Sequence, residues 1–220
     1  MNLILFLIAF IFPLFAVQRD AAIGSYVTVP PDAPTVIIDA GHGGTDLGAR
    51  GRTPYCEEKR VCLQTARLVK KYLNQLGYHV VMTRNSDAFI SLSRRVEIAD
   101  QASGALFVSL HFNSSRNPTA QGIEVFFYEN KEDRSRTSAS RKLADAVLGR
   151  LVRRTAAVSR GTKKGNFYVI RETTMPAILV EGGFISNPSE RTNLKSREYQ
   201  EKIARGVADG IDAFMKKNKF

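Results

Sequence analysis

Short apolar runs alternate along this chain with longer segments of helical periodicity, and this alternation is the feature that most restricts its fold. The apolar runs predict strands, at Val36–Ile38, Tyr78–Thr83, Ala105–Leu110, Gly122–Tyr128, Phe167–Ile170 and Ala177–Val180. Segments with apolar residues at helical spacing predict helices, at Glu58–Leu76, Ser91–Gln101, Ser138–Val152 and Glu198–Lys216. Strands that alternate with helices are typical of an α/β fold, so we expect a single domain with a mostly parallel central sheet flanked by helices.

The N-terminal part of the chain departs from this alternation. Residues 3–17 are apolar without a break, and the stretch is shorter than the roughly 20 residues that a membrane-spanning helix needs. Its length is typical of the apolar region of a signal peptide, so we predict a signal peptide or an uncleaved anchor at residues 1–17. Residues 18–34 contain three prolines and no helical periodicity, which indicates a linker. The folded domain is then expected at residues 35–220, exported from the cytoplasm.

The charge balance of the chain predicts an anionic partner. Lys and Arg number 32 against 21 Asp and Glu, which gives a formal net charge of +11. Much of the excess lies between Lys131 and Lys164, either as a solvated helix face or as a basic flank for an anionic polymer. We expect no nucleic-acid partner, because export would separate the protein from nucleic acid. The sequence also carries no recognised nucleic-acid-binding motif. Cys56 and Cys62 are too few for a disulfide framework, although export would permit a bond between them.

Polar residues with catalytic chemistry stand at the ends of three predicted strands. His42 follows the first strand in a glycine-rich loop, His111 ends ALFVSL, and Glu181 ends AILV. In open α/β sheets ligands bind at the carboxyl ends of the strands, so these three side chains are expected at one rim. Two histidines and one carboxylate, with an open fourth position, are a common catalytic zinc site. The carboxylate ligand is expected after His42, where the pattern alone does not decide between Glu57 and Glu58.

Signatures of other chemistries are absent from the sequence. There is no Gly-x-Ser-x-Gly elbow and no Ser-x-x-Lys motif, so a serine hydrolase and penicillin-binding-protein chemistry are unsupported. The loop around His42 lacks the Gly-Lys-Ser/Thr ending of a phosphate-binding loop. The remaining histidine, His79, begins a strand away from the rim and is interpreted as structural.

Several separated motifs then identify a family. In chain order they read IIDAGHGGTDLGARG, EEKRVCL, LSRRVEIAD, LFVSLHFNSS, GIEVFF and PAILVEGGFISNPSE. Together they resemble the zinc-dependent N-acetylmuramoyl-L-alanine amidases of the amidase-3 type, from about Thr35 to the last helix. The resemblance implies that zinc is held by His42, Glu58 and His111, with Glu58 chosen because it directly precedes a lysine, and that Glu181 is the catalytic glutamate.

The resemblance also implies a location, a reaction and a substrate. The exported domain would be periplasmic or associated with the cell wall, where its basic segment could face an anionic wall polymer or membrane. The bond cut is the amide between the lactyl group of N-acetylmuramic acid and L-alanine of the peptidoglycan stem peptide. Zinc would polarise the carbonyl and activate water, while Glu181 moves the proton to the leaving amine. Asn113 is expected to hold the peptide or the oxyanion, and Arg95 to support the fold. The alternatives are a zinc peptidase that cuts within the stem peptide and a non-catalytic wall-binding module.

Regulation by an activator protein is not expected. Some members of the family carry a long insertion whose helix plugs the zinc site until a partner removes it. Here the corresponding stretch, Glu129–Asn166, is short, and most of it is the helix predicted at Ser138–Val152. That helix has apolar positions at the spacing needed to pack on the sheet, so it is expected to belong to the core.

Overall fold

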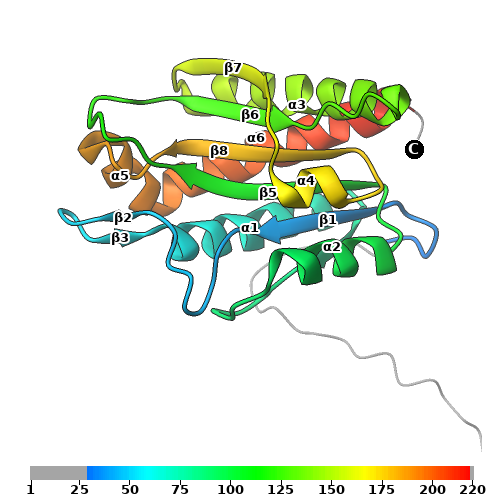
Figure 1. The fold of residues 1–220 in the computed structure, drawn as a ribbon, viewed down its shortest axis with the longest axis horizontal. Coiled ribbons are helices and arrows are strands. Elements are labelled where there is room, and N and C mark those ends of the chain that lie inside the picture. The colour runs from blue at the N-terminus through cyan, green and yellow to red at the C-terminus, as the bar shows by residue number, and fades with distance from the viewer. Residues whose placement is uncertain (1–28, 219–220) are drawn as a thin grey trace, which may run out of the picture.

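A six-stranded sheet forms the centre of the molecule and lies between two layers of helices (Figure 1). The computed structural model describes residues 29–218, so the predicted signal peptide or anchor at residues 1–17 lies outside the described residues. In their order across the sheet the strands are β4 (His79–Met82), β1 (Thr35–Ala40), β5 (Leu106–Asn113), β8 (Ala177–Phe184), β6 (Ile123–Phe127) and β7 (Ser159–Lys164). All neighbouring strands are parallel except β8 and β6, which confirms the expected α/β fold.

Helices cover the two faces of the sheet unequally. One face carries the long helices α1 (Glu58–Gln75), α3 (Arg134–Thr155) and α6 (Arg197–Asn218) (Figure 1). The opposite face carries the shorter helices α2 (Leu92–Gln101) and α4 (Tyr168–Glu172). The remaining elements lie where β5 and β8 finish: α5 (Pro188–Lys195) and the small sheet of β2 (Arg50–Gly51) and β3 (Cys56–Glu57). None of the helices within residues 29–218 is both long and apolar enough to span a lipid bilayer.

The alternation of side chains along β5 places a polar group on the thinly covered face. Leu106, Val108 and Leu110 pack into the larger core with residues of α1, α3 and α6. Phe107 packs into the smaller core under α2 and α4. Because successive side chains of a strand point to opposite faces, His111 lies on the same side as Phe107. The side chain of His111 lies past the edge of the smaller core and lines a cleft.

Two segments differ from the secondary structure that the sequence predicts. The predicted strand Phe167–Ile170 is wrong, because Tyr168–Glu172 forms the helix α4. Val169 and Ile170 are buried in the smaller core, and an apolar run this short does not distinguish a strand from one helical turn. Conversely, the sequence does not predict β7, because its residues SRGTKK are polar. It is an edge strand, where lysines discourage further pairing.

The cysteines and the third histidine have structural environments. Cys56 and Cys62 are both buried and both free, so the disulfide that export would permit is absent from the structure. A ring nitrogen of His79, Nε2, lies 2.8 Å from the carbonyl oxygen of Pro30. This contact attaches the segment before β1 to the edge strand β4, which agrees with the structural interpretation of His79.

The helix α3 packs into the core as predicted, although it is longer than the predicted Ser138–Val152. Its buried apolar side chains face the sheet and α6; they are Leu143, Ala144, Val147, Leu148 and Leu151. The basic side chains in its last turn, Arg153 and Arg154, are exposed. The helix therefore contributes to the core through one face and leaves a basic face to solvent.

Candidate metal centre

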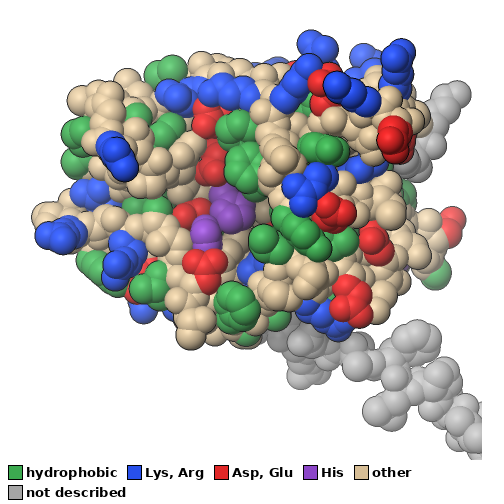
Figure 2. All heavy atoms as spheres, in the orientation of Figure 1, with side chains coloured by type: hydrophobic (Ala, Val, Ile, Leu, Met, Phe, Trp, Pro, Cys, Tyr) green, Lys and Arg blue, Asp and Glu red, His purple; other side chains and the backbone are tan. Residues whose placement is uncertain are grey.

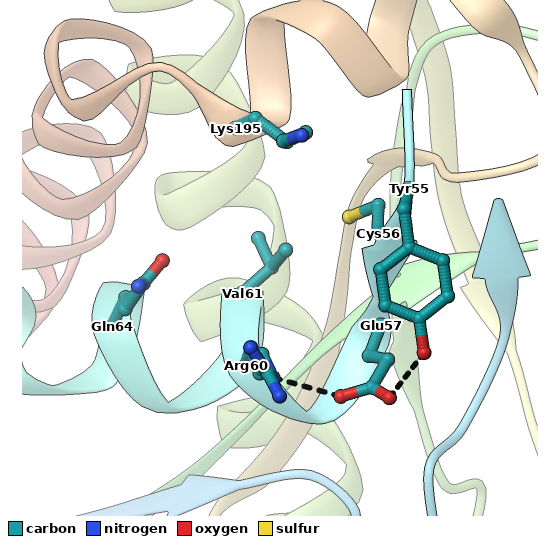
Figure 3. A pocket seen from close by; sticks show the side chains of 7 residues that line it. All are labelled: Tyr55, Cys56, Glu57, Arg60, Val61, Gln64 and Lys195. Atoms are coloured by element: carbon teal, nitrogen blue, oxygen red, sulfur yellow. Dashed lines mark hydrogen bonds and ion pairs between the residues drawn. The ribbon is translucent and has the colours of Figure 1, made fainter. Parts of the chain in front are cut away.

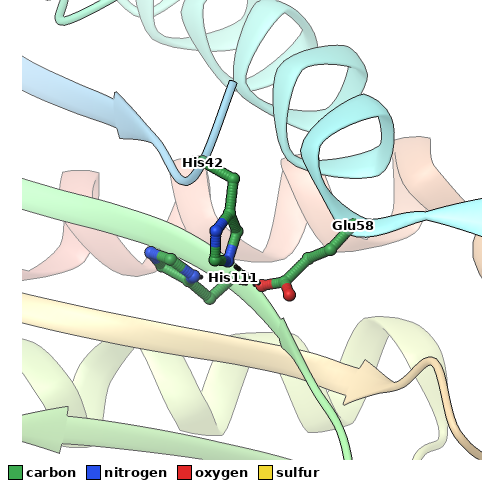
Figure 4. Close-up of side chains that lie close together, drawn as sticks. All are labelled: His42, Glu58 and His111. Carbon is green, nitrogen blue, oxygen red and sulfur yellow. Dashed lines mark hydrogen bonds and ion pairs between the residues drawn. The ribbon is translucent and has the colours of Figure 1, made fainter. Parts of the chain in front are cut away.

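Two histidines and one glutamate converge at the carboxyl ends of β1 and β5. His42 follows β1, Glu58 is the first residue of α1, and His111 lies near the end of β5 (Figure 4). Nε2 of His42 and Nδ1 of His111 each lie 3.0 Å from Oε1 of Glu58. The ligand atoms of the three residues all lie within 4.8 Å of one another. Among residues 29–218 this is the one cluster of His, Cys, Asp and Glu side chains that could hold a metal ion.

The ring of His42 is oriented by a local carboxylate. His42 has a φ of 59°, in the left-handed region, which turns the chain sharply after β1. Nδ1 of His42 lies 2.8 Å from Oδ2 of Asp46, and this contact directs Nε2 toward Glu58. A carboxylate on the second ring nitrogen is the usual partner of a metal-binding histidine.

Two buried arginines hold the backbone of the loop that carries His42. Arg84 donates to the carbonyl oxygens of Ala40 and Gly41, at 2.8 and 2.6 Å. Arg95 donates to the carbonyl oxygens of Ala40 and His42, at 2.7 and 2.6 Å. The expectation that Arg95 supports the fold is therefore confirmed. Gly41 is needed here because a Cβ atom at that position would lie 2.4 Å from the ring of His111.

Glu58 is held by backbone donors as well as by the histidines. The N–H of Phe112 donates to Oε1 and the N–H of Ala49 donates to Oε2, at 3.0 and 2.8 Å. Burial by itself would raise the pKa of Glu58, but hydrogen bonds and charge interactions with His111 and His42 outweigh it and lower the pKa. Glu58 is therefore an ionised, fixed carboxylate.

The neighbouring Glu57 points into a different cavity. That cavity, of about 380 Å³, is lined by Tyr55, Cys56, Glu57, Arg60, Val61, Gln64 and Lys195 (Figure 3). Glu57 accepts a hydrogen bond from Tyr55, and its other oxygen lies 2.8 Å from Nε of Arg60. Both oxygens are thus engaged away from the histidines. Of the two glutamates that the residue pattern alone left open, Glu58 is the one that lies beside the histidines.

Glu181 stands beside the cluster on the next strand. It pairs in register with His111 of β5, and on its other side with Glu124 of β6. Its Oε2 is buried and has no hydrogen-bond partner among the described residues. Burial raises the pKa of Glu181 well above its ordinary value, and the charges of Glu58 and Glu124 raise it further. The site therefore combines one carboxylate that stays ionised with one that readily holds a proton.

The donor set fits zinc. Two imidazole nitrogens and one ionised carboxylate oxygen, all on one side of a cleft, are a ligand set that catalytic zinc sites use. The carboxylate of Asp46 on His42 supplies the outer contact that such sites carry.

Comparison with known proteins assigns the family. The model of the N-acetylmuramoyl-L-alanine amidase family, Amidase_3, matches residues 36–213. The chain belongs to this family.

Relatives of the chain are found in several bacteria. The chain is 39% identical to YqiI of Bacillus subtilis over 185 residues, which cover 84% of this chain and 86% of YqiI. It is 31% identical to the probable cell wall amidase LytH of Staphylococcus epidermidis, and the match covers 84% of this chain but only 60% of LytH.

Solved structures of amidases share the fold. The catalytic domain of CwlV, an N-acetylmuramoyl-L-alanine amidase from Bacillus (Paenibacillus) polymyxa, superposes with a TM-score of 0.77 at 38% identity, covering 83% of this chain and 98% of that domain. The CwlD amidase of Clostridioides difficile, solved in complex with the GerS lipoprotein, has a TM-score of 0.77 at 27% identity. That match covers 84% of this chain and 99% of CwlD.

The cleft of this amidase-family chain has an apolar wall. The cleft holds about 340 Å³ beside the cluster and continues into a second hollow of about 310 Å³ that shares His42 and His111. Side chains of the α2 and α4 segments line these hollows although they are large, apolar and exposed; they are Phe89, Leu92, Phe167 and Tyr168. This side of the cleft therefore offers apolar surface to a ligand.

Glu124 is a residue of the site that the sequence patterns did not reveal. It is 4% exposed, and it accepts hydrogen bonds from Asn113 at 2.7 Å, Arg160 at 2.9 Å and Lys163 at 2.5 Å. The signal was available, since a glutamate inside the apolar run GIEVFF needs partners when buried. Asn113, which is expected to hold the peptide or the oxyanion, donates its amide to Glu124 and also lines the cleft.

Proposed function

We propose that this chain is a zinc-dependent amidase that cuts the amide between N-acetylmuramic acid and L-alanine of the peptidoglycan stem peptide. The observation that carries the proposal is the convergence of His42, ionised Glu58 and His111 beside the protonatable Glu181. Membership of the amidase family supplies the substrate class.

His42, Glu58 and His111 would hold the metal. Zinc bound there supplies a Lewis acid that polarises a carbonyl and makes water more acidic. The ionised state of Glu58 and the orientation of His42 by Asp46 prepare the ligands before a metal arrives. This preparation supports a resident metal rather than a fortuitous one.

Glu181 would act as general base and then as general acid. Its raised pKa suits both roles, because a carboxyl group that holds a proton more readily can accept one and later return it. It would take a proton from the attacking water and give it to the amine nitrogen of L-alanine, which leaves poorly unless protonated. The absence of a hydrogen-bond partner for Oε2 within the described residues leaves this oxygen available for that transfer.

The cellular setting follows from the substrate. Peptidoglycan lies outside the cytoplasm, so we place the domain at residues 35–220 there, delivered by residues 1–17 as signal peptide or anchor and joined to them by the linker at 18–34. The relative LytH is a probable cell wall amidase, which supports this location. We propose no nucleic-acid partner.

We also propose that no activator protein is required. The CwlD amidase was solved in complex with a lipoprotein, so a partner does occur on this fold. In the present chain, α3 occupies the stretch where a plug would lie, and its apolar face is buried in the core. None of the residues that line the two hollows of the cleft comes from α3.

One experiment tests the proposal and its alternatives. The purified chain, without other proteins, is incubated with peptidoglycan in the presence of zinc or of a chelator, and the products are identified by mass spectrometry. We expect new L-alanine amino termini with zinc, none with chelator, and recovery when zinc is restored. Cleavage within the stem peptide would identify a peptidase, and binding without cleavage would identify a wall-binding module. Activity that appears only after a partner is added would contradict the absence of an activator.

A further inference from the structure

A row of polar side chains crosses the sheet from the metal cluster toward the edge strand β7. His111 of β5, Glu181 of β8 and Glu124 of β6 are register partners, so their side chains lie on the same face of the sheet. Arg160 and Lys163 of β7 reach this row by bonding to Oε2 of Glu124. Figure 2 shows acidic side chains next to the two histidines and a band of Lys and Arg side chains along the β7 edge beyond them.

The end of this row carries an excess of positive charge toward solvent. The side chain of Glu124 is 6% exposed, whereas those of Arg160 and Lys163 are 36% and 40% exposed. One buried carboxylate is thus paired with two cations that remain open on their outer sides. A second anion that approached from solvent would meet both cations, while the carboxylate of Glu124 stays buried.

The guanidinium of Arg160 is already held in place. Nε donates to Glu124 and Nη1 donates to the carbonyl oxygen of Gln121 at 3.3 Å. The guanidinium carbon lies 4.9 Å from the centre of the Phe184 ring. Nη2 forms no hydrogen bond with any residue from 29 to 218. An arginine fixed in this way, with donors left over, loses little conformational entropy when it binds a carboxylate.

We propose that Arg160 and Lys163 form a subsite for a carboxylate of the stem peptide, on the residue that follows L-alanine. This inference rests on the proposed function. It assigns the apolar wall of α2 and α4 to the sugar side of the scissile bond and the β7 edge to the peptide side.

The spacing of the sheet agrees with this assignment. Neighbouring strands lie about 4.8 Å apart, so β7 lies roughly 10 Å from β8, which carries Glu181. An extended peptide advances about 3.4 Å per residue. The residue after L-alanine, with a side chain that ends in a carboxylate, therefore spans the distance from Glu181 to the inward-reaching heads of Arg160 and Lys163.

Two matched substrates test the subsite. Both are N-acetylmuramoyl-L-alanyl dipeptides with a blocked carboxyl terminus; the second residue carries a free side-chain carboxylate in one and the carboxamide in the other. For the zinc-loaded chain we expect kcat/KM to be about tenfold higher with the carboxylate, the size of one charge-assisted hydrogen bond. The difference should lie mainly in KM, because this carboxylate is remote from the reacting bond.

Three variants separate the subsite from a general charge effect. Lys163→Gln should bring the ratio of kcat/KM for the two substrates close to one. Arg160→Lys keeps the charge but loses the planar fork, so it should lower the ratio in part. Lys164→Gln removes the same charge one residue further along, where the side chain pairs with Glu129, and it should keep the wild-type ratio. Circular dichroism checks that each variant is folded, and the ratio in the wild type tests the subsite even if one is not.

Failure of the subsite and failure of the proposed function give different results. If whole peptidoglycan is hydrolysed and the two substrates have equal kcat/KM, Arg160 and Lys163 serve only to neutralise Glu124, and the subsite is disproved. If Lys164→Gln lowers the ratio as much as Lys163→Gln does, the preference comes from overall charge. If the zinc-loaded chain releases no L-alanine amino termini even from whole peptidoglycan, the proposed function fails, and this inference fails with it.

Discussion

At the scale of single residues, the proposed site separates the groups that would hold a metal from the group that would move a proton. His42 and His111 share one oxygen of Glu58, and backbone N–H groups fix that carboxylate from both sides. Glu181 lies one strand away, and its Oε2 has no such donor within residues 29–218. The two glutamates therefore have pKa values shifted in opposite directions by their surroundings.

This separation predicts different losses in different variants. His42→Ala and His111→Ala should each lose bound zinc together with activity, because each removes one of three protein ligands. Glu181→Gln should retain zinc while turnover falls at least about 100-fold, the usual contribution of a general acid–base group. Metal content by mass spectrometry and turnover on peptidoglycan are measured on the same preparations. A zinc-free Glu181→Gln protein would make Glu181 a ligand and reverse its assignment.

A buried carboxylate beneath the site supports its framework. Asp39 is 1% exposed, and it accepts hydrogen bonds of 2.6 Å from Thr83, Ser109 and Arg95. Burial alone would raise the pKa of Asp39, but the charge of Arg95 and the three hydrogen bonds outweigh it and lower the pKa. Arg95 in turn holds the loop of His42, so Asp39 links the core to the proposed metal site.

The lowered pKa of Asp39 gives a stability prediction with a definite sign. Above the unfolded pKa of about 3.9 the ionised carboxylate contributes its full stabilisation, and this is lost as the pH falls through the lower, folded pKa. Asp39→Asn should lower the free energy of unfolding at neutral pH by about 3 kcal/mol, because Arg95 is left buried without a counter-charge. Urea denaturation of wild type and variant should show this difference narrowing below about pH 4. A difference that stayed constant with pH would mean that Asp39 is not ionised in the native state.

At the scale of elements, the long helices α3 and α6 approach each other closely. A Cβ atom added at Gly210 of α6 would lie 2.5 Å from Cα of Val147 in α3. Backbone atoms cannot rotate away as a flexible side chain can, so the two helices would have to separate. The contact matters to the site because α3 and α6 pack together under the strands that carry Glu124 and Glu181.

Two glycine substitutions with opposite expectations test this contact. Gly210→Ala should lower the free energy of unfolding by about 1–3 kcal/mol, the range typical of an overpacked core. Gly149 in α3 has no atom within 4 Å of an added Cβ, so Gly149→Ala should be neutral or stabilising by up to about 1 kcal/mol. Chemical denaturation of both variants provides the comparison. If both had the same effect, the helix contact would not be the cause.

At the scale of the whole molecule, the positive charge divides between two places. Arg160 and Lys163 stand on the β7 edge beside Glu124, whereas Arg150, Arg153 and Arg154 surround a shallow hollow with Asp209 on the solvent side of α3 and α6. The segment from Lys131 to Lys164, which carries the charge excess, therefore contributes basic residues to two surfaces. For the outer surface, around Arg150, Arg153 and Arg154, binding of anionic wall polymer or membrane stays a prediction.

Wall binding by the outer surface can be measured directly. Arg150→Glu combined with Arg153→Glu should reduce co-sedimentation with peptidoglycan walls, most strongly at low salt, because exposed charges are screened as ionic strength rises. Lys70→Glu combined with Lys71→Glu changes the net charge equally on another helix and should have a smaller effect. Equal losses would attribute wall binding to net charge alone. No loss at low salt would make the basic face of α3 a solvated surface only.

Local patterns in the sequence were sufficient for the architecture and for much of the site. Apolar runs and helical spacing predicted most of the elements, because burial on a sheet or a helix face imposes those periods. His42, His111 and Glu181 could be found because parallel strands end at one edge, so residues at the ends of strands meet. The helix predicted at Ser138–Val152 packs into the core because its apolar residues recur at helical spacing on one face.

Tertiary structure alone decided the contacts between segments that are distant in the sequence. The pattern of residues could not tell Glu57 from Glu58, because only the direction in which α1 leaves β3 sends one side chain to Tyr55 and the other to the histidines. The sequence pattern also could not predict the strand β7 or its ion pair with Glu124. A polar edge strand has no period of burial, and a buried ion pair depends on which strands become neighbours, which the sheet settles only when it assembles.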